Sequence, residues 1–426
     1  MKTNVKSQLL RCSILAVFFL LGCTDDRPTE KPYRVTHEYS VRDREFTNTV
    51  GSLLGPPLVD GNEVKTLVNG EQIFPAMLEA IRAAKKTITF ETYVYWRGDI
   101  GRQFTDALCE RAQNGVKVHA IIDVVGSDRI DQQYFKQLED AGVEVIQYHA
   151  LRWYDWTSTS KLNYRTHRKL LIIDGEVGFT GGVGIADEWN GNADSKDHWR
   201  DNHYRVRGPC VAQLQAAFAD NWMATTGKVL HGADYFPEVH NIGEKTAQVF
   251  KSSVKGGSES MQLLYLLSFA SAEKSIRLCS AYFVLDDLTI HTLLEARQRG
   301  VKVQIIVPGP DIDVKVVRTA SRARWGEMLK AGVEIYEYQP TMYHTKLMVV
   351  DDLWVSIGSA NLDERSFRMN AEANLNVMDQ AFAQEQMRIF EDDLAHSKQM
   401  TYEQWAHRPG NEKFMESFAT MFGWMM

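Results

Sequence analysis

Two histidine–lysine pairs occupy matching places in this chain. His167 and Lys169 open the stretch HRKLLIID, and His344 and Lys346 open the stretch HTKLMVVD. Both stretches are otherwise rich in apolar residues and read as buried strands, on which residues two apart point to the same face. Burying an imidazole beside an ammonium group is costly unless an anion lies opposite them. The pattern therefore predicts two contributions to one anion site.

A phosphodiester suits such a site best. One histidine could attack phosphorus and form a covalent phosphohistidine, while the other protonates the leaving oxygen as a general acid. Lys169, Lys346 and Asn361 could bind the non-bridging oxygens, where negative charge builds in the transition state. We expect neither a metal nor a cofactor, because the lysines supply the positive charge.

Each histidine would also need a carboxylate on Nδ1, which fixes its tautomer and stabilises the imidazolium ion. Asp201 follows His167 by 34 residues, and Glu372 follows His344 by 28 residues. The two acids occupy corresponding places after the two motifs. We predict that they orient the histidines; the alternative is that each is an ordinary surface carboxylate.

The chain is an internal repeat, which supports one shared site. Four pairs of similar stretches follow one another in the same order, offset by roughly 180–190 residues. They are 84–95 with 272–283, 114–127 with 299–310, 141–148 with 331–338, and 167–174 with 344–351. Two homologous lobes follow, and we expect them to pack about a pseudo-twofold axis.

Strands and helices are expected to alternate within each lobe. Residues 87–95 are rich in β-branched and aromatic side chains, as strands are. Apolar residues recur at helical spacing in 100–115, and Gly115 is a helix stop. Residues 116–123 are nearly all apolar, as in a sheet covered on both faces. The predicted fold class is α/β, with a mixed sheet flanked by helices in each lobe.

The N-terminus resembles a targeting segment. Positive residues precede an apolar run at 13–21, which is too short to span a bilayer as a helix. The following stretch, LLGC, resembles a bacterial lipoprotein signal, in which Cys23 would be lipidated. The alternatives are a plain signal peptide or a short anchor helix. We expect an enzyme that is lipid-anchored on the outer side of a bacterial inner or outer membrane.

The net charge of the chain limits the kinds of partner that it can bind. The chain has 426 residues, a formal net charge of -7 and a pI near 6.0, which disfavours a nucleic-acid partner.

An apolar stripe in the C-terminal tail favours a helix docked on the core over a helix that lies in the membrane interface. The expected segments are a signal at 1–22, a polar tether at 23–45, an N-terminal lobe at 46–225, a connection at 226–246, a C-terminal lobe at 247–400 and a tail at 401–426.

The doubled HxKxxxxD motif, followed in the second half by GSAN, resembles the phospholipase D superfamily. Stretches 69–81, 91–104, 179–189 and 359–367 are most similar to bacterial cardiolipin synthases. The resemblance covers nearly all of the mature chain, from about Val64 onward. It implies that His167 is the nucleophile and that His344 acts first as general acid and then as general base.

The resemblance also implies roles for the residues around the histidines. Lys169, Lys346 and Asn361 match the phosphate binders, and Ser359 and Gly182 match positions that border the substrate. Asp174 and Asp351 seldom touch substrate in the family, and we expect them to brace the turn after each strand. The first half departs from the pattern, since Gly182 replaces Ser and Gly184 replaces Asn in its GGVG stretch.

The resulting functional prediction is a phosphatidyltransferase that makes cardiolipin from two molecules of phosphatidylglycerol. Its expected partners are a phospholipid substrate and a membrane surface. A phospholipase D hydrolase would use the same covalent step with water as the acceptor. Two less favoured possibilities are a nuclease of the superfamily and a non-catalytic, lipid-binding relic of the fold.

Overall fold

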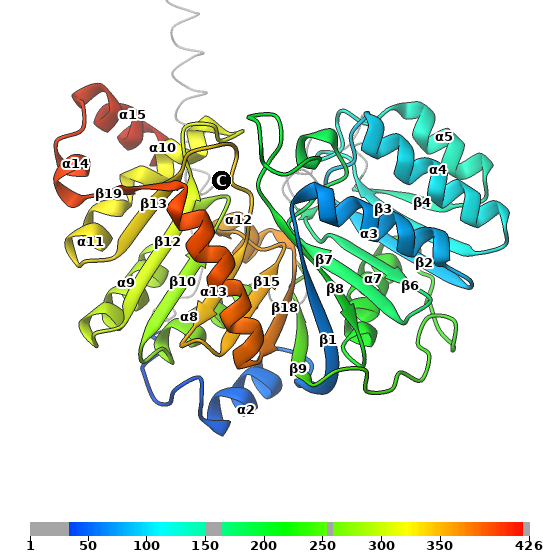
Figure 1. Ribbon diagram of the computed structural model, residues 1–426, viewed down its shortest axis with the longest axis horizontal. Helices are drawn as coiled ribbons and strands as arrows, with labels where there is room; N and C mark the ends of the chain where they lie inside the picture. Colours follow the sequence, from blue (N-terminus) through cyan, green and yellow to red (C-terminus); the bar gives the residue numbers. More distant parts are fainter. Residues whose placement is uncertain (1–33, 150–163, 254–258, 421–426) are drawn as a thin grey trace, which may run out of the picture. The chain divides into compact units, whose positions relative to one another are not determined.

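One large mixed sheet joins the two halves of the chain (Figure 1). The computed structural model describes residues 34–149, 164–253 and 259–420. Within these ranges the sheet has fifteen strands, in the order β19-β13-β12-β10-β14-β15-β18-β9-β1-β8-β7-β6-β2-β3-β4. The halves meet where β1 (Val59–Val68) pairs antiparallel with β9 (Lys245–Lys251). On either side of this junction, apart from the added edge strand β19, equivalent strands follow in mirrored order.

The N-terminal half contributes six further strands to the sheet. They are β2 (Thr87–Thr92), β3 (Lys117–Asp123), β4 (Glu144–Tyr148), β6 (Leu170–Ile173), β7 (Val177–Gly181) and β8 (Asn202–Arg207). Its helices are α3 (Asn69–Ala83), α4 (Asp99–Gln113), α5 (Gln132–Asp140), the short 3-10 helix η1 (Asp187–Trp189) and α7 (Val211–Thr226). Strands β2, β3 and β4 are parallel, whereas β6, β7 and β8 run antiparallel to their neighbours.

The C-terminal half repeats this arrangement. Its strands in the sheet are β10 (Ser275–Cys279), β12 (Lys302–Pro308), β13 (Glu334–Tyr338), β14 (Leu347–Val350), β15 (Trp354–Gly358), β18 (Ala373–Met378) and β19 (Ser397–Met400). Its helices are α8 (Glu259–Ala270), α9 (Asp287–Gln298), α10 (Lys315–Ala323), α11 (Trp325–Lys330), α12 (Glu364–Arg368) and α13 (Gln380–Ala395). The mixed α/β fold predicted from the sequence is confirmed.

Apolar side chains form a core in each half and a third core that both halves share. Phe74, Phe90 and Phe104 lie in the N-terminal cluster beneath α3 and α4. The shared cluster contains Trp222 of α7 and Phe390 of α13, together with strands from both halves. The halves are therefore packed as one body, which fixes the place of one motif relative to the other.

The first described helix, α2 (Arg44–Leu53), lies on the half that is distant from it in sequence. Phe46 and Val50 belong to the apolar cluster of the C-terminal half. The ring of Phe46 meets Trp354 of β15 edge-on, with 5.1 Å between the ring centroids. The sequence prediction began the N-terminal lobe at residue 46, but this helix packs as part of the C-terminal half.

The C-terminal tail forms α14 (Tyr402–Ala406) and α15 (Gly410–Thr420), and α15 lies against α10. Glu416 is buried there and pairs with Arg408 at 2.6 Å, whereas Phe414 is 72% exposed. Arg322 of α10 pairs with Glu412 of α15 at 3.2 Å, so an ion pair, rather than the exposed Phe414 side chain, connects this helix to α10. The end of that stripe, the proposed signal and Cys23 lie outside the described residues. No described helix combines the length and apolar character that crossing a bilayer requires.

Candidate active site

Backbone pairing between the halves brings the two motifs together. The short strand β5 (Arg165–Thr166) leads into His167 and pairs with β17 (Asn370–Ala371), which leads into Glu372. The amide of His167 donates to the carbonyl of Ala371 at 2.9 Å. In the other half, a bridge joins Arg200 to Tyr343, the residues that precede Asp201 and His344. Each histidine is thus placed beside an acid of the opposite half.

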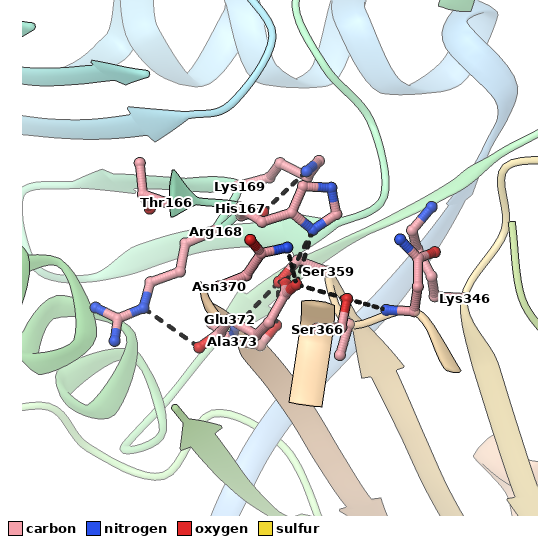
Figure 2. Close-up of polar contacts among 12 residues, drawn as sticks. Thr166, His167, Arg168, Lys169, Lys346, Ser359, Ser366, Asn370, Glu372 and Ala373 are labelled. Carbon is pink, nitrogen blue, oxygen red and sulfur yellow. Dashed lines mark hydrogen bonds and ion pairs between the residues drawn. The ribbon is translucent and has the colours of Figure 1, made fainter. Parts of the chain in front are cut away.

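The side chains complete this crossed arrangement. Nδ1 of His167 lies 3.0 Å from both carboxylate oxygens of Glu372 (Figure 2). Nδ1 of His344 lies 2.7 Å from Oδ2 of Asp201. The sequence places each acid downstream of the motif in its own half, but the structure pairs each acid with the other half's histidine. With Nδ1 donating to a carboxylate, Nε2 is the ring nitrogen that remains for chemistry.

Both lysines lie close to their histidines. Nζ of Lys169 donates to the carbonyl of His167 at 2.8 Å, and Nζ of Lys346 donates to the carbonyl of His344 at 2.6 Å. Nζ of Lys346 also lies 3.1 Å from Nε2 of His344. All four side chains are buried. The sequence prediction that the four groups gather around one place agrees with this geometry.

Burial lowers the pKa of both histidines in the free protein. It is the main cause that brings the pKa of His167 to about 4 and that of His344 to about 3. Charges act across the halves as well, since Lys346 lowers the pKa of His167 and Lys169 lowers the pKa of His344. Both imidazoles are therefore neutral near pH 7, which is the nucleophilic form.

The same burial acts on the lysines and the acids. It is the main cause that lowers the pKa of Lys169 to about 7 and that of Lys346 to about 8. Burial would raise the pKa of Glu372, but His167, Lys169 and Ser359 outweigh it and bring the pKa to about 2. Both orienting acids are ionised near pH 7, because His344 and Lys346 likewise outweigh burial and lower the pKa of Asp201.

Side chains with hydroxyl and amide groups surround Glu372 (Figure 2). Ser359 Oγ donates to Oε2 at 2.5 Å, Ser366 Oγ donates to Oε1 at 2.9 Å, and Asn370 Nδ2 donates to Oε1 at 3.3 Å. The resemblance places Ser359 among residues that border the substrate. In this structure its single hydroxyl proton is directed at Glu372, so its contact here is with the orienting acid.

Asp201 has a different environment in the other half. The indole Nε1 of Trp189 donates to Oδ2 of Asp201 at 3.0 Å, and the amide of Asn202 donates to Oδ1 at 2.8 Å. Gly182, which stands where the second half has Ser359, leaves room for this acid. A Cβ atom at Gly182 would lie 2.4 Å from Oδ1 of Asp201. The packing of the first half therefore requires glycine at position 182.

Asn361 and its counterpart Gly184 also differ in their surroundings. Asn361 is buried, and its Oδ1 has no hydrogen-bond partner among the described residues. This oxygen is a hydrogen-bond acceptor, so it is available to a donor group of a ligand, such as a hydroxyl group. At Gly184 a Cβ atom would lie 2.7 Å from Cβ of Val94 and 3.2 Å from the indole of Trp189. The first half has filled the corresponding space with apolar groups.

The motif aspartates lie at the far end of each motif strand. The carboxylate of Asp174 accepts the backbone N–H groups of Lys85, Lys86 and Thr87, at 2.7–3.2 Å. Asp351 accepts those of residues 273–275 at 2.7–2.9 Å. Both aspartates have positive φ, 54° and 52°. They tie the turn after the motif strand to the start of the neighbouring strand, as the sequence prediction proposed.

Sequence reasoning missed the buried ion pairs that support the backbone next to the histidines and their acids. Arg165 pairs with Asp123 at 2.8 Å, and Arg200 pairs with Asp393 at 2.7 Å, all four being buried. Each arginine belongs to the backbone pairing that leads into a histidine or its acid. Ser366 and Trp189 were missed too, although the alignment of 359–367 with 182–190 places them at equivalent positions. No group of three His, Cys, Asp or Glu side chains within the described ranges forms a metal site.

Comparisons with known proteins agree with this geometry. The family model described as "Cardiolipin synthase, PLD-like domain" matches residues 77–222 and 265–394. Cardiolipin synthase 1 of Bacillus anthracis is 34% identical over 388 residues, which cover 89% of this chain and 75% of that protein. Cardiolipin synthase of Geobacillus sp. strain WCH70 is 35% identical over 367 residues, covering 86% of this chain and 72% of that protein.

Among solved structures, phosphatidylserine synthase of Haemophilus influenzae Rd KW20 has the same fold. Its TM-score is 0.66 at 14% sequence identity, and the match covers 90% of this chain and 100% of that one. The two-segment family match coincides with the two halves that supply the crossed histidine–acid pairs. With this fold and curated relatives at about one-third identity over most of its length, the chain belongs to the cardiolipin synthase family with phospholipase D-like domains.

Proposed function

We propose that the protein is a phosphatidyltransferase that makes cardiolipin and glycerol from two molecules of phosphatidylglycerol. Family membership supports an enzyme of the phosphatidyltransferase type. The observation that carries the mechanism is the pair of buried imidazoles, each held through Nδ1 by a carboxylate of the opposite half. One such pair can supply the nucleophile, and the other can supply the general acid and base.

In the first step, Nε2 of His167 attacks the phosphorus of one phosphatidylglycerol. A bond forms between nitrogen and phosphorus, and the bond between phosphorus and the glycerol headgroup oxygen breaks. The leaving oxygen takes a proton from Nε2 of protonated His344, so free glycerol departs. Glu372 stabilises the positive charge on the His167 ring, to which its carboxylate is hydrogen-bonded.

In the second step, the headgroup hydroxyl of another phosphatidylglycerol attacks the phosphohistidine. His344, now neutral, removes the hydroxyl proton while the new phosphorus–oxygen bond forms and the phosphorus–nitrogen bond breaks. His167 is released as a neutral imidazole. The proton returns to His344, so the cycle closes with one cardiolipin and one glycerol formed from two phosphatidylglycerols.

His344 must carry a proton when the first step begins, although its pKa in the free protein is about 3. A bound phosphodiester brings a negative charge next to the imidazole and raises its pKa. Lys169 and Lys346, which repel the protonated rings in the free protein, can bind the phosphate oxygens instead. Asn361 of the GSAN stretch is the further candidate for this role, through the N–H groups of its Nδ2.

The proposed setting is a membrane surface, with the chain anchored through a lipid on Cys23. The LLGC stretch at the end of an apolar segment supports this proposal. The chemistry supports it independently, because donor and acceptor are both diacyl lipids that reside in a bilayer. The anchor would keep the enzyme at the surface where its substrates are concentrated.

Product analysis tests the proposed function. Purified protein incubated with phosphatidylglycerol vesicles should form cardiolipin and glycerol in equal amounts, and His167→Ala and His344→Ala should abolish both. His291→Asn, at an exposed position on α9, is the control that should leave turnover unchanged. Phosphatidic acid as the sole lipid product would overturn the proposal in favour of a hydrolase.

A further inference from the structure

The two histidine–acid pairs have chemically different supports at equivalent positions of the repeat. Trp189 and Ser366 stand 177 residues apart, the same interval that separates His167 from His344. Each donates to the acid of its own half, Trp189 Nε1 to Asp201 at 3.0 Å and Ser366 Oγ to Glu372 at 2.9 Å. One repeat position thus supplies a hydrogen-bond donor to the orienting acid in both halves.

The first half depends more heavily on this one donor. From the residues that the structure describes, Glu372 receives three side-chain hydrogen bonds in addition to that of His167. Within the described part of the chain, Asp201 receives one side-chain hydrogen bond besides that of His344, and it comes from Trp189. Gly182 offers no hydroxyl, and a serine there would collide with Asp201. The indole N–H of Trp189 is therefore the side-chain donor to Asp201, as the hydroxyl groups of Ser359 and Ser366 are side-chain donors to Glu372.

The indole also contacts the histidine that Asp201 orients. The rings of Trp189 and His344 meet at 83° with 5.2 Å between their centroids, an edge-to-face contact. The Trp199 ring lies 5.8 Å from the same imidazole. Oδ2 of Asp201 accepts from both Trp189 and His344. A shift of the indole would therefore move the acid and the imidazole together.

We infer that Trp189 is the positioning residue of His344, acting through its indole N–H on Asp201. It aligns the acid–base histidine without touching substrate, and its indole N–H donates to Asp201 where hydroxyl groups donate to Glu372. Gly182 and Gly184 are the matching small residues that make room for Asp201 and the indole. The inference rests on the proposed acid–base role of His344.

The test separates reactions that need a proton donor from those that do not. Trp189→Phe keeps an aromatic ring and removes the N–H. Turnover of phosphatidylglycerol, whose glycerol leaving group needs a proton, should fall at least about tenfold. Single-turnover release of p-nitrophenolate from phosphatidyl-p-nitrophenol, which leaves without a proton, should change by less than about threefold. Equal losses on both substrates, or no loss on either, would overturn the inference.

Trp96→Phe is the matched control. Its indole N–H donates to the carbonyl of Gly126 at 2.8 Å, and its ring lies 6.2 Å from that of Trp189, but it does not bond to Asp201. Any loss caused by Trp96→Phe should therefore be the same for both substrates. A leaving-group dependence like that of Trp189→Phe in this control would assign the effect to general packing and contradict the inference.

A second replacement keeps the test informative if Trp189→Phe does not fold. Site-specific incorporation of the benzothiophene analogue of tryptophan at position 189 preserves the shape of the ring system and removes only the N–H. The same selective loss is expected, and its absence would contradict the inference. The p-nitrophenolate assay reports phosphoryl transfer to the enzyme even if wild-type protein makes no cardiolipin. Failure of the proposed function is therefore distinguishable from failure of this inference.

Discussion

Glu372 of the second half holds His167 of the first, with Nδ1 3.0 Å from each of the two carboxylate oxygens. The acid is ionised, because its pKa is about 2, and it is therefore the partner that lets His167 become cationic during phosphoryl transfer. The pair crosses the boundary between the halves, so its integrity depends on how the halves pack.

Replacing this acid should impair the covalent step itself. Glu372→Gln leaves a side chain of similar shape that cannot balance a positive His167. Release of p-nitrophenolate in a single turnover should fall by about 10³-fold or more, in contrast to the small effect expected for Trp189→Phe. Far-ultraviolet circular dichroism serves as the check on folding, and near-normal release by folded Glu372→Gln would contradict the role of this acid.

Introducing a serine at Gly182 should damage the enzyme, although it makes the first half resemble the second. The added Cβ would lie 2.4 Å from Oδ1 of Asp201, so the acid must move. Turnover of phosphatidylglycerol by Gly182→Ser should fall by about tenfold or more as His344 loses its alignment. The reciprocal change, Ser359→Gly, creates no clash and should cost less. Equal activity of Gly182→Ser and wild type would show that Asp201 can relocate without consequence.

Loss of the Asp174 carboxylate should destabilise the fold more than it slows the reaction. Its oxygens accept three consecutive backbone N–H groups at the start of β2. Asp174→Ala should lower the free energy of unfolding by about 2–4 kcal/mol, measured by urea denaturation. Turnover per folded molecule should stay within about threefold of wild type. Glu176→Ala, on the exposed side of the same turn, is the control and should have little effect on stability.

Stability should decrease as the pH falls from about 6.5 to about 4. In this range an unfolded chain protonates its histidines, whereas burial keeps His167 and His344 neutral, with pKa values of about 4 and about 3. The unfolded state binds more protons, so acid favours unfolding. The low pKa of Glu372 extends the loss below pH 4.5. Urea denaturation across this range should show a smaller slope for His167→Gln, and an unchanged slope would contradict the assignment.

The proposed anchor has a direct biochemical test. Cells that express the chain and are fed radiolabelled palmitate should incorporate label into the protein, which should sediment with membranes. Cys23→Ala should remove the label. Cys109→Ala provides a cysteine control that should keep it. Labelling that persists in Cys23→Ala would place the lipid elsewhere or refute the lipoprotein interpretation.

The repeat was readable from the sequence because strand patterns and charged motifs recur in one order. It was enough to predict the mixed α/β fold in two lobes and to select His167, Lys169, His344 and Lys346. The crossed pairing was not readable, since Asp201 and Glu372 each follow a motif in their own half and only the packing of the halves decides their partners. Trp189 escaped notice because an indole does not look like a substitute for a serine hydroxyl.

Crossed pairing also constrains how such a protein can arise and change. A polypeptide with a single half would carry a histidine and an acid that cannot serve each other, so it would function only as a symmetric pair of identical copies. Once two copies are joined in one chain, the sequences of the two halves can differ. The indole beside Asp201 and the hydroxyl groups around Glu372 are the divergence that this freedom permits.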